Sequence, residues 1–279
     1  MNLSNENVIH VNKNGVQYLQ FRKLLEYSDI INHAYTLGTN VDYRTSTVDK
    51  KPLSEEKHNE SINNYKKICQ AIGSNYLNCA QPIQLHTKNI MIIDKKINSD
   101  APDLLEQAYN ETDGLITNQK NIILSTTNAD CILLIFFDPV KKVISNVHSG
   151  WKGTLQEISV VAVEKMIKEF NCNPSDIICC ICPSIRKCHF EVDNDVKEMF
   201  FDKFKDLEEI NDIIEYKEEK DKWHIDTVLI NKSILKKVGL REENIIDCGI
   251  CSVCNSDLIH SFRVEGQGYG VETALIELK

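Results

Sequence analysis

The chain has 279 residues, a formal net charge of −9, and hydrophobic and charged fractions of 42% and 26%, which are ordinary values for a globular protein. The negative charge argues against general binding to nucleic acid, because phosphate backbones are bound by basic patches. No apolar run approaches the roughly 20 residues of a membrane-spanning helix, and the polar residues 1–6 contain no apolar signal segment. We therefore expect a cytoplasmic protein that binds neither nucleic acid nor a membrane.

The first part of the chain is predicted to begin with a β-hairpin. Two runs of β-forming residues flank Asn14-Gly15, a dipeptide that is typical of tight hairpin turns. In chain order, the elements predicted up to residue 112 are strands at 8–11 and 16–21, a polar surface excursion or lid at 40–64, a helix at 62–72 ended by Gly73, strands at 83–85 and 90–93, and a loop at 95–112.

The rest of the chain is predicted to supply the centre of the fold. Continuous apolar runs rich in β-forming residues indicate strands that are buried on both faces. Asp226 and Gly239 have the positions of an N-cap and a C-terminal stop around one helix. The elements predicted from residue 115 on are strands at 115–117, 122–126, 132–137 and 143–147, a helix at 158–170, a strand at 177–181, a charged and solvated insertion at 201–222, a helix at 226–238, and strands at 258–262 and 274–278.

No internal repeat and no linker rich in proline or glycine divides the chain. We therefore expect one mixed α/β domain that spans residues 1–279. The sequence leaves open whether this domain is a monomer or a homodimer.

Three short segments each place a metal-binding side chain at the end of a predicted strand, namely His86, Cys131 and His148. Loops at strand ends can direct such side chains toward a common cleft. Two imidazoles and one thiolate leave one position of a tetrahedral zinc ion open, as catalytic zinc sites require. On spacing alone a structural role is the more common one for such residues, since a histidine at a strand end is more often hydrogen-bonded within the fold and a buried cysteine more often packs in the core.

The motifs around these residues resemble one family in order from about residue 33 to 278. They are Q-L-H at 84–86, T-D-G-L-I-T at 112–117, T-T-N-A-D-C at 126–131, V-H-S-G-W-K-G at 147–153, C-P-S-I-R-K-C-H-F-E-V at 182–192 and H-S-F-R-V-E-G at 260–266. Together they resemble the purine nucleoside phosphorylase family formerly described as multicopper polyphenol oxidoreductase, or laccase-domain protein.

This resemblance implies a fold, a metal site and an activity. The fold is a single-domain α/β (α+β) sandwich of mixed sheets with helices on the outer faces, similar to the cytotoxic-necrotising-factor-like fold. The metal is Zn²⁺, with copper as a possible substitute, held by His86, Cys131 and His148. The activity is phosphorolysis of adenosine, inosine, guanosine and methylthioadenosine by phosphate, together with deamination of adenosine.

Three residues near these motifs are candidate catalytic groups. Arg263 matches the first arginine of a family pattern, and Lys152 stands where most relatives have arginine, so either cation is expected to bind an anion. A surface ion pair is the alternative for both. Asp130 is expected to hydrogen-bond a ligand imidazole or to accept a proton, with a turn residue as the alternative. The acidic residue Asp113 matches a recurring family position without a role that the sequence assigns.

Two departures from the family pattern remove positive charge. An early arginine of the family is missing from the segment 35–38, and the second arginine of the later pattern is Val264. These losses weaken the expectation of phosphorolysis more than that of metal binding.

Three other functions stay open at this point. A copper polyphenol oxidase needs histidines in close pairs for several copper ions, whereas the eight histidines form no H-x-H pair. A zinc amidase or hydrolase that edits a cell-wall peptide precursor would use the same open metal position. A metal or redox sensor without turnover is a more distant alternative.

Most of the eleven cysteines are expected to be buried, reduced and structural. The C-x2-C-x2-C run of Cys248, Cys251 and Cys254 resembles part of an iron–sulfur motif, but its fourth cysteine is absent. Cys188 and His189 offer a thiol beside an imidazole. Because adjacent residues of a strand point to opposite faces, these two are expected not to pair.

Overall fold

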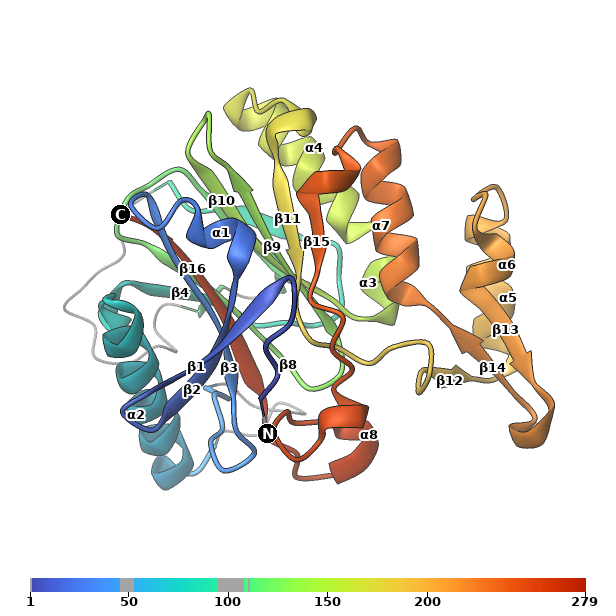
Figure 1. Ribbon diagram of the computed structural model, residues 1–279, viewed down its shortest axis with the longest axis horizontal. Helices are drawn as coiled ribbons and strands as arrows, with labels where there is room; N and C mark the ends of the chain where they lie inside the picture. The colour runs from blue at the N-terminus through green and yellow to red at the C-terminus, as the bar shows by residue number, and fades with distance from the viewer. Residues whose placement is uncertain (1, 46–52, 95–107, 110) are drawn as a thin grey trace.

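Two large mixed β-sheets pack face to face, and helices cover their outer faces (Figure 1). The computed structural model describes residues 2–45, 53–94, 108–109 and 111–279. The expected mixed α/β sandwich with outer helices is confirmed. Among the described residues, no helix is both long and apolar enough to span a bilayer.

The first sheet has seven strands and brings the two ends of the chain together. The early strands pair antiparallel with one another and with the last strand of the chain, and the parallel pairings follow at the far edge. In spatial order the strands are β1 (Val8–Lys13), β2 (Val16–Phe21), β3 (Ile31–Leu37), β16 (Glu272–Leu278), β8 (Ile123–Asn128), β4 (Cys79–Pro82) and β6 (Ala108–Tyr109).

The second sheet has six strands, and its centre is the antiparallel pair predicted from the apolar runs at 132–137 and 143–147. Both edges of this sheet are parallel pairs. In spatial order the strands are β15 (Ile245–Asp247), β11 (Ile178–Ile181), β9 (Ile132–Asp138), β10 (Val143–Ser149), β7 (Gly114–Thr117) and β5 (Ile90–Ile92).

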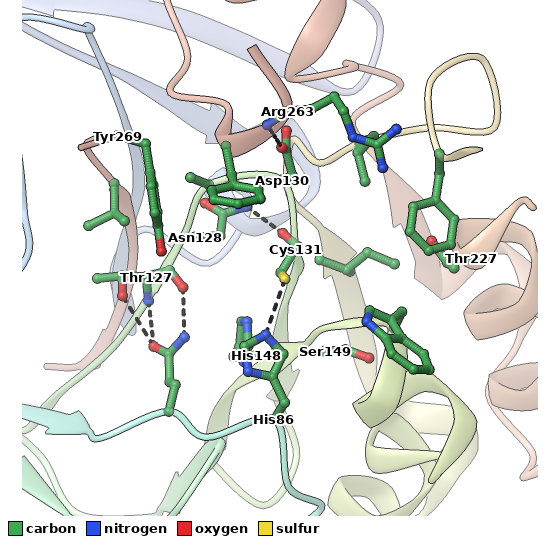
Figure 2. A pocket seen from close by; sticks show the side chains of 18 of the residues that line it. His86, Thr127, Asn128, Asp130, Cys131, His148, Ser149, Thr227, Arg263 and Tyr269 are labelled. Carbon is green, nitrogen blue, oxygen red and sulfur yellow. Dashed lines mark hydrogen bonds between the residues drawn. The ribbon is translucent and has the colours of Figure 1, made fainter. Parts of the chain in front are cut away.

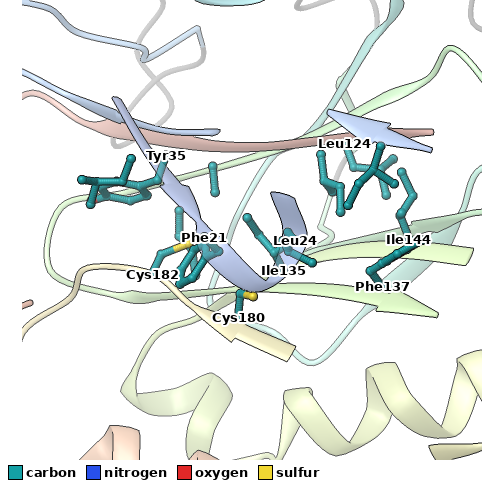
Figure 3. Close-up of a cluster of buried hydrophobic side chains, with 14 of the residues drawn as sticks. Phe21, Leu24, Tyr35, Leu124, Ile135, Phe137, Ile144, Cys180 and Cys182 are labelled. Carbon is teal, nitrogen blue, oxygen red and sulfur yellow. The ribbon is translucent and has the colours of Figure 1, made fainter. Parts of the chain in front are cut away.

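The main hydrophobic core lies between the two sheets (Figure 3). Leu124 and Tyr35 enter it from the seven-stranded sheet, and Ile135 and Phe137 enter it from the six-stranded sheet. Because β9 and β11 of the six-stranded sheet are covered on both faces, they consist of continuous apolar runs rather than alternating ones. This explains why the centre of the chain was recognisable from its composition.

Three helices cover the outer faces of the sheets. Helix α2 (Glu55–Ile72) packs Tyr65 and Ile68 on the seven-stranded sheet. Helices α4 (Ile158–Phe170) and α7 (Thr227–Lys237) pack on the six-stranded sheet. The cap predicted at Asp226 is confirmed, since its carboxylate accepts a hydrogen bond from the backbone nitrogen of Leu229 at 2.8 Å.

The charged segment at 201–222, predicted to be a solvated insertion, instead belongs to a folded unit at one end of the molecule (right in Figure 1). Phe200, Phe204 and Ile213 form its own buried cluster, which continues into α3 and α7. The sequence prediction was wrong because these few apolar residues become a core only against neighbouring helices. The unit consists of β12 (Glu191–Val192), α5 (Asn194–Phe204), α6 (Ile210–Ile213), β13 (Ile214–Lys217) and β14 (Lys222–Ile225).

Two other predicted strands are absent from the described chain. Residues 83–85 form an irregular segment after β4, and residues 258–262 form turns that lead into α8 (Phe262–Glu265).

The polar excursion at 40–64 is shorter than predicted, because α2 begins at Glu55. The loop at 95–112 falls largely outside the described residues. The remaining helices are α1 (Arg22–Leu25) and α3 (Trp151–Leu155).

The two sheets are also joined by a buried polar side chain. Asn146 of β10 is fully buried, and its Nδ2 donates to the carbonyl oxygens of Leu124 and Ala274 at 2.9 and 2.8 Å. Its Oδ1 accepts a hydrogen bond from the Thr126 hydroxyl at 2.6 Å. All three partners belong to the opposite sheet.

We expect Asn146→Ala to lower the free energy of unfolding by about 2 to 4 kcal/mol, because buried carbonyl and hydroxyl groups lose their partners. Urea denaturation measures the change. Asn63→Ala, on the exposed face of α2, is the matched control and should stay within about 0.5 kcal/mol of the unchanged protein. A loss for Asn146→Ala as small as that of the control would contradict the role of this side chain.

Candidate metal centre

A cavity of about 640 Å³ opens where β4, β8 and β10 end (Figure 2). The sequence predicted that His86, Cys131 and His148 would share a cleft, and all three line this cavity. Cys131 lies in the turn between β8 and β9, and His148 lies near the end of β10. His86 lies in the irregular segment that follows β4.

The three side chains are close enough to share one ion. One ligand atom from each lies within 4.8 Å of the other two, and Cys131 Sγ is 3.8 Å from His86 Nε2. Zinc bonds of about 2.3 Å to sulfur and about 2.1 Å to nitrogen, at a tetrahedral angle, separate these atoms by about 3.6 Å. The donor set and its spacing therefore fit a tetrahedral cation with one position left for another ligand.

Asp113 holds two of these candidate ligands in place. Its Oδ1 lies 2.9 Å from His148 Nδ1 and accepts the backbone N–H of His86 at 3.0 Å. Its Oδ2 accepts the backbone N–H and the hydroxyl of Thr87 at 2.7 and 2.8 Å. Since an ionised carboxylate only accepts, Nδ1 of His148 carries a proton, and Nε2 is the ring nitrogen left to bind a metal. The sequence singled out Asp113 without a role, and this contact supplies one.

The backbone around the candidate ligands is arranged for close approach. His86 adopts a left-handed conformation with φ of 60°, which is uncommon for a residue other than glycine. A Cβ atom at Gly150 would lie only 2.4 Å from the His86 ring and 3.3 Å from Cys131 Sγ. Glycine at position 150 is therefore required by the space that these two side chains occupy.

Charge around Cys131 favours the form that binds metals. Burial raises the pKa of the thiol, but the His148 and His86 imidazoles outweigh burial and lower this pKa to about 6. Burial lowers the pKa of His148, but Cys131 and Asp113 outweigh it and raise this pKa to about 9. At neutral pH the thiolate is thus available, and a bound cation would take the place of the proton on His148.

Asp130 connects the metal segment to the C-terminal wall of the cavity. Its Oδ1 accepts the hydroxyls of Ser252 and Ser261 at 2.6 and 2.8 Å, and its Oδ2 accepts the backbone N–H of Arg263 at 2.7 Å. In the described chain, these hydrogen-bond partners include no imidazole. The contacts favour a positioning role for Asp130, and its catalytic role stays a prediction.

The two candidate cations differ in their positions. The Arg263 side chain lines the cavity and donates to the carbonyl oxygen of His189 at 2.9 Å. Lys152 is exposed, its Nζ lies 5.4 Å from the ring centre of Trp151, and it is not among the described residues that line the cavity. The geometry thus brings Arg263, but not Lys152, to the candidate site.

Arg44 is a cavity residue that the sequence did not single out. It lines the cavity with its guanidinium 4.5 Å from the ring centre of Tyr269. The early arginine expected in segment 35–38 is absent, but Arg44 supplies positive charge from near the start of the polar excursion that follows this segment. It follows the buried Tyr43, and no local pattern in the sequence distinguishes it from a surface arginine.

Four aromatic side chains line the same cavity. Phe262 and Tyr269 meet edge to face with ring centres 5.1 Å apart. Trp151 also packs against the cluster of the end unit, so it contributes to the cavity and to packing. With Phe190 these side chains offer flat apolar surface beside the candidate metal ligands.

Comparison with known proteins identifies a family match over most of the chain. The model of the family described as multi-copper polyphenol oxidoreductase laccase matches residues 45–279. That range contains all three candidate metal ligands and Asp113.

Curated relatives of this chain carry enzyme names. It is 28% identical over 224 residues to the purine nucleoside phosphorylase YlmD of Bacillus subtilis (strain 168), covering 80% of this chain and 79% of that protein. It is 27% identical over 260 residues to the purine nucleoside phosphorylase LACC1 of Homo sapiens, covering 90% of this chain but only 56% of that longer protein. It is 28% identical over 203 residues to the adenosine deaminase RL5 of an unknown prokaryotic organism, covering 73% and 76%.

Solved structures share the fold. The crystal structure of the YfiH protein of Bacillus licheniformis superposes with a TM-score of 0.80 at 23% identity, covering 94% of this chain and 96% of that one. At this level of identity the likeness concerns the fold alone.

We expect Asp113→Asn to weaken zinc binding about 10- to 100-fold, because the amide lacks the negative charge beside His148 and the second acceptor oxygen that holds Leu85 and Thr87. Competition with a chromophoric chelator measures the affinity. Asp138→Asn is the matched control, since Asp138 is another buried carboxylate that accepts backbone N–H groups, those of Val140 and Lys141. Equal zinc affinity in the two variants would contradict the role given to Asp113.

Proposed function

Because this chain belongs to the family described as multi-copper polyphenol oxidoreductase laccase, we propose that it is a zinc-dependent enzyme of purine nucleosides. The reactions are phosphorolysis of adenosine, inosine, guanosine and methylthioadenosine, and deamination of adenosine. The observation that carries the proposal is the open set of His86, Cys131 and His148 in an aromatic cavity. The names of the relatives, phosphorylase and adenosine deaminase, support the same class of substrate.

Zinc suits the donor set better than copper. When bound, a zinc ion supplies a Lewis acid with a position open to water or substrate. The family description mentions several copper ions, and a multicopper oxidase holds them mainly with histidines. Among the described residues, only three histidines, His86, His148 and His189, belong to candidate metal groups. The chain thus lacks the paired histidines of a multicopper oxidase, and oxidation of polyphenols receives little support.

The chain's own residues would bind and orient the nucleoside. A purine is flat and apolar on both faces, so it is suited to aromatic walls such as Tyr269, Phe262 and Phe190. A cavity of about 640 Å³ lies within the usual range for small-molecule sites. Asp113 keeps His148 protonated on Nδ1, and Asp130 keeps the backbone of Arg263 beside the cavity.

Phosphorolysis also needs a place for an anion. In that reaction a phosphate oxygen forms a bond to C1′ of the ribose, and the bond from C1′ to the base nitrogen breaks. Arg263 and Arg44 both line the cavity, and guanidinium groups bind phosphate through paired N–H donors. We propose these two arginines as the anion site. The role of Lys152 stays a separate prediction.

We further propose that residues 1–279 act as one domain in the cytoplasm. The shared core of the two large sheets supports the first statement. The reduced state of the thiols, all eleven of which are free, supports the second, since cysteines stay reduced in that compartment.

The proposal is tested by incubating purified protein with adenosine and with inosine, in the presence and absence of phosphate. Chromatography should detect inosine formed from adenosine without phosphate, and free base only when phosphate is present. His148→Ala should lose at least about 100-fold in both activities, and it should also lose the zinc ion of the cavity, because one of its three ligands is gone. Absence of both products, or full activity in the variant, would refute the proposal.

Arg263→Ala should separate the two reactions. We expect the KM for phosphate to rise about 10- to 100-fold, with adenosine deamination changed by less than about 3-fold, because only phosphorolysis uses the anion. Arg241→Ala, at an exposed arginine outside the cavity lining, is the matched control. An equal loss in both reactions would assign Arg263 a structural role, and Lys152→Ala tests the competing cation in the same assay.

A further inference from the structure

Four metal-binding side chains meet at a second place in the molecule. Cys188, His189, Cys251 and Cys254 each offer one ligand atom, and these atoms lie within 4.8 Å of one another. None of them belongs to the set of His86, Cys131 and His148. Three of the four are cysteines, and all three are free thiols.

The topology explains how residues more than 60 positions apart come together. Strands β11 and β15 are parallel neighbours, so the loops that leave their carboxyl ends start at the same edge of the sheet. Cys188 and His189 lie in the first loop, and Cys251 and Cys254 lie in the second. A parallel bridge between Ser184 and Cys251 continues the pairing beyond the strands.

The distances between the candidate ligand atoms are close to those of tetrahedral coordination, with one nitrogen–sulfur pair shorter than ideal. Sγ of Cys188 lies 3.6 Å from Sγ of Cys251 and 3.9 Å from Sγ of Cys254. Zinc–sulfur bonds of about 2.3 Å at a tetrahedral angle separate two sulfur atoms by about 3.8 Å. Nδ1 of His189 lies 3.1, 3.7 and 3.6 Å from the three sulfur atoms, against about 3.6 Å for ideal sulfur–nitrogen pairs.

We propose that Cys188, His189, Cys251 and Cys254 form a second, structural zinc site of the Cys3His type. Four protein ligands leave no open position, which distinguishes this site from the three-ligand centre in the cavity. Binding one Zn²⁺ releases the protons of the three thiols to solvent, so the site carries one net negative charge. Arg263 lies beside it, with Nη1 bonded to the His189 carbonyl oxygen, and offsets that charge.

The structure separates this site from the interpretations that the sequence left open. Cys248 shares the C-x2-C-x2-C run, but its Sγ is buried in the main core and lies 3.5 Å from Arg186. The run therefore supplies two ligands and not three. The expectation that Cys188 and His189 do not pair was wrong, because they lie in a turn and not on a strand, and a turn lets adjacent side chains point the same way.

The second site connects two walls of the cavity. Phe190 and Glu191, which follow His189, line the cavity, and so does Arg263. Ser252, which follows Cys251, donates to Asp130 beside the candidate ligand Cys131. A zinc ion at the second site therefore holds both loops against the turn that carries Cys131.

Metal analysis of the full-length protein tests the proposal. The unchanged protein should hold about two zinc ions per chain, and His148→Ala should retain about one. Adding Cys188→Ser and Cys254→Ser to His148→Ala should remove that remaining ion. Cys248→Ser in the same background is the matched control, because it removes a thiol of the same run without removing a ligand, and it should keep the ion.

A measurement on the unchanged protein covers the case in which the serine variants fail to fold. Cys188 and Cys254 are exposed, so unliganded thiols would react at once with a mercurial reagent. Bound thiols should react together with release of zinc, seen with a metal-sensitive dye, and cobalt in their place should give the visible absorption of tetrahedral cobalt thiolates.

Several outcomes would overturn the second site. They are a His148→Ala protein that holds no metal, a remaining ion that persists in the double serine variant, and a disulfide among the three cysteines in protein purified without oxygen. A chain whose single zinc is lost with Cys188 and Cys254 but not with His148 would support this site while refuting the cavity metal. The test is thus independent of the proposed function.

Discussion

The buried carboxylate of Asp113 is the contact on which the candidate metal centre depends. It accepts N–H groups from Leu85, His86 and Thr87, and it also accepts the imidazole proton of His148. One side chain thereby fixes a backbone turn and a ring orientation at the same time. Losing this carboxylate removes a hydrogen bond from the backbone of left-handed His86 and another from the ring of His148, so both candidate ligands would be positioned less firmly.

Around this contact, the fold uses strand ends as attachment points. The pairs β4·β8 and β9·β10 bring the segments with His86, Cys131 and His148 to one edge. The side chain of Gln84 extends the first pairing, since its amide bonds both the N–H and the carbonyl oxygen of Thr127. In the first motif of the sequence, Q-L-H, Gln84 therefore binds the backbone of β8, and His86 is a candidate metal ligand.

The proposed second zinc site uses the same principle with a different result. Parallel strands β11 and β15 again carry loops to one edge, but four ligands meet there and close the site. An open site allows substrate binding, whereas a closed one contributes stability. Two sites of different ligand number, connected through Asp130 and Arg263, would separate the chemistry from the support of the cavity wall.

The sequence by itself determined the features that depend on local patterns. The apolar period predicted α4 from Ile158 to Phe170, and the cap at Asp226 predicted the start of α7. Continuous apolar runs predicted the central strands, because such runs are stable only when covered on both faces. The order of the motifs predicted the family and the mixed α/β sandwich, and the positions of His86, Cys131 and His148 predicted a shared cleft.

Only the tertiary structure decided where contacts across the fold override the local preference of a segment for strand or helix. The segments 83–85 and 258–262 have the composition of strands, yet carboxylates of Asp113 and Glu272 accept the N–H groups of Leu85 and His260 that a β-ladder would need. Arg44 reaches the cavity, and Cys188 meets Cys251 across 63 positions, through pairings that no local pattern encodes. A side chain's partner across the fold depends on where both strands end, and that is a property of the assembled sheets.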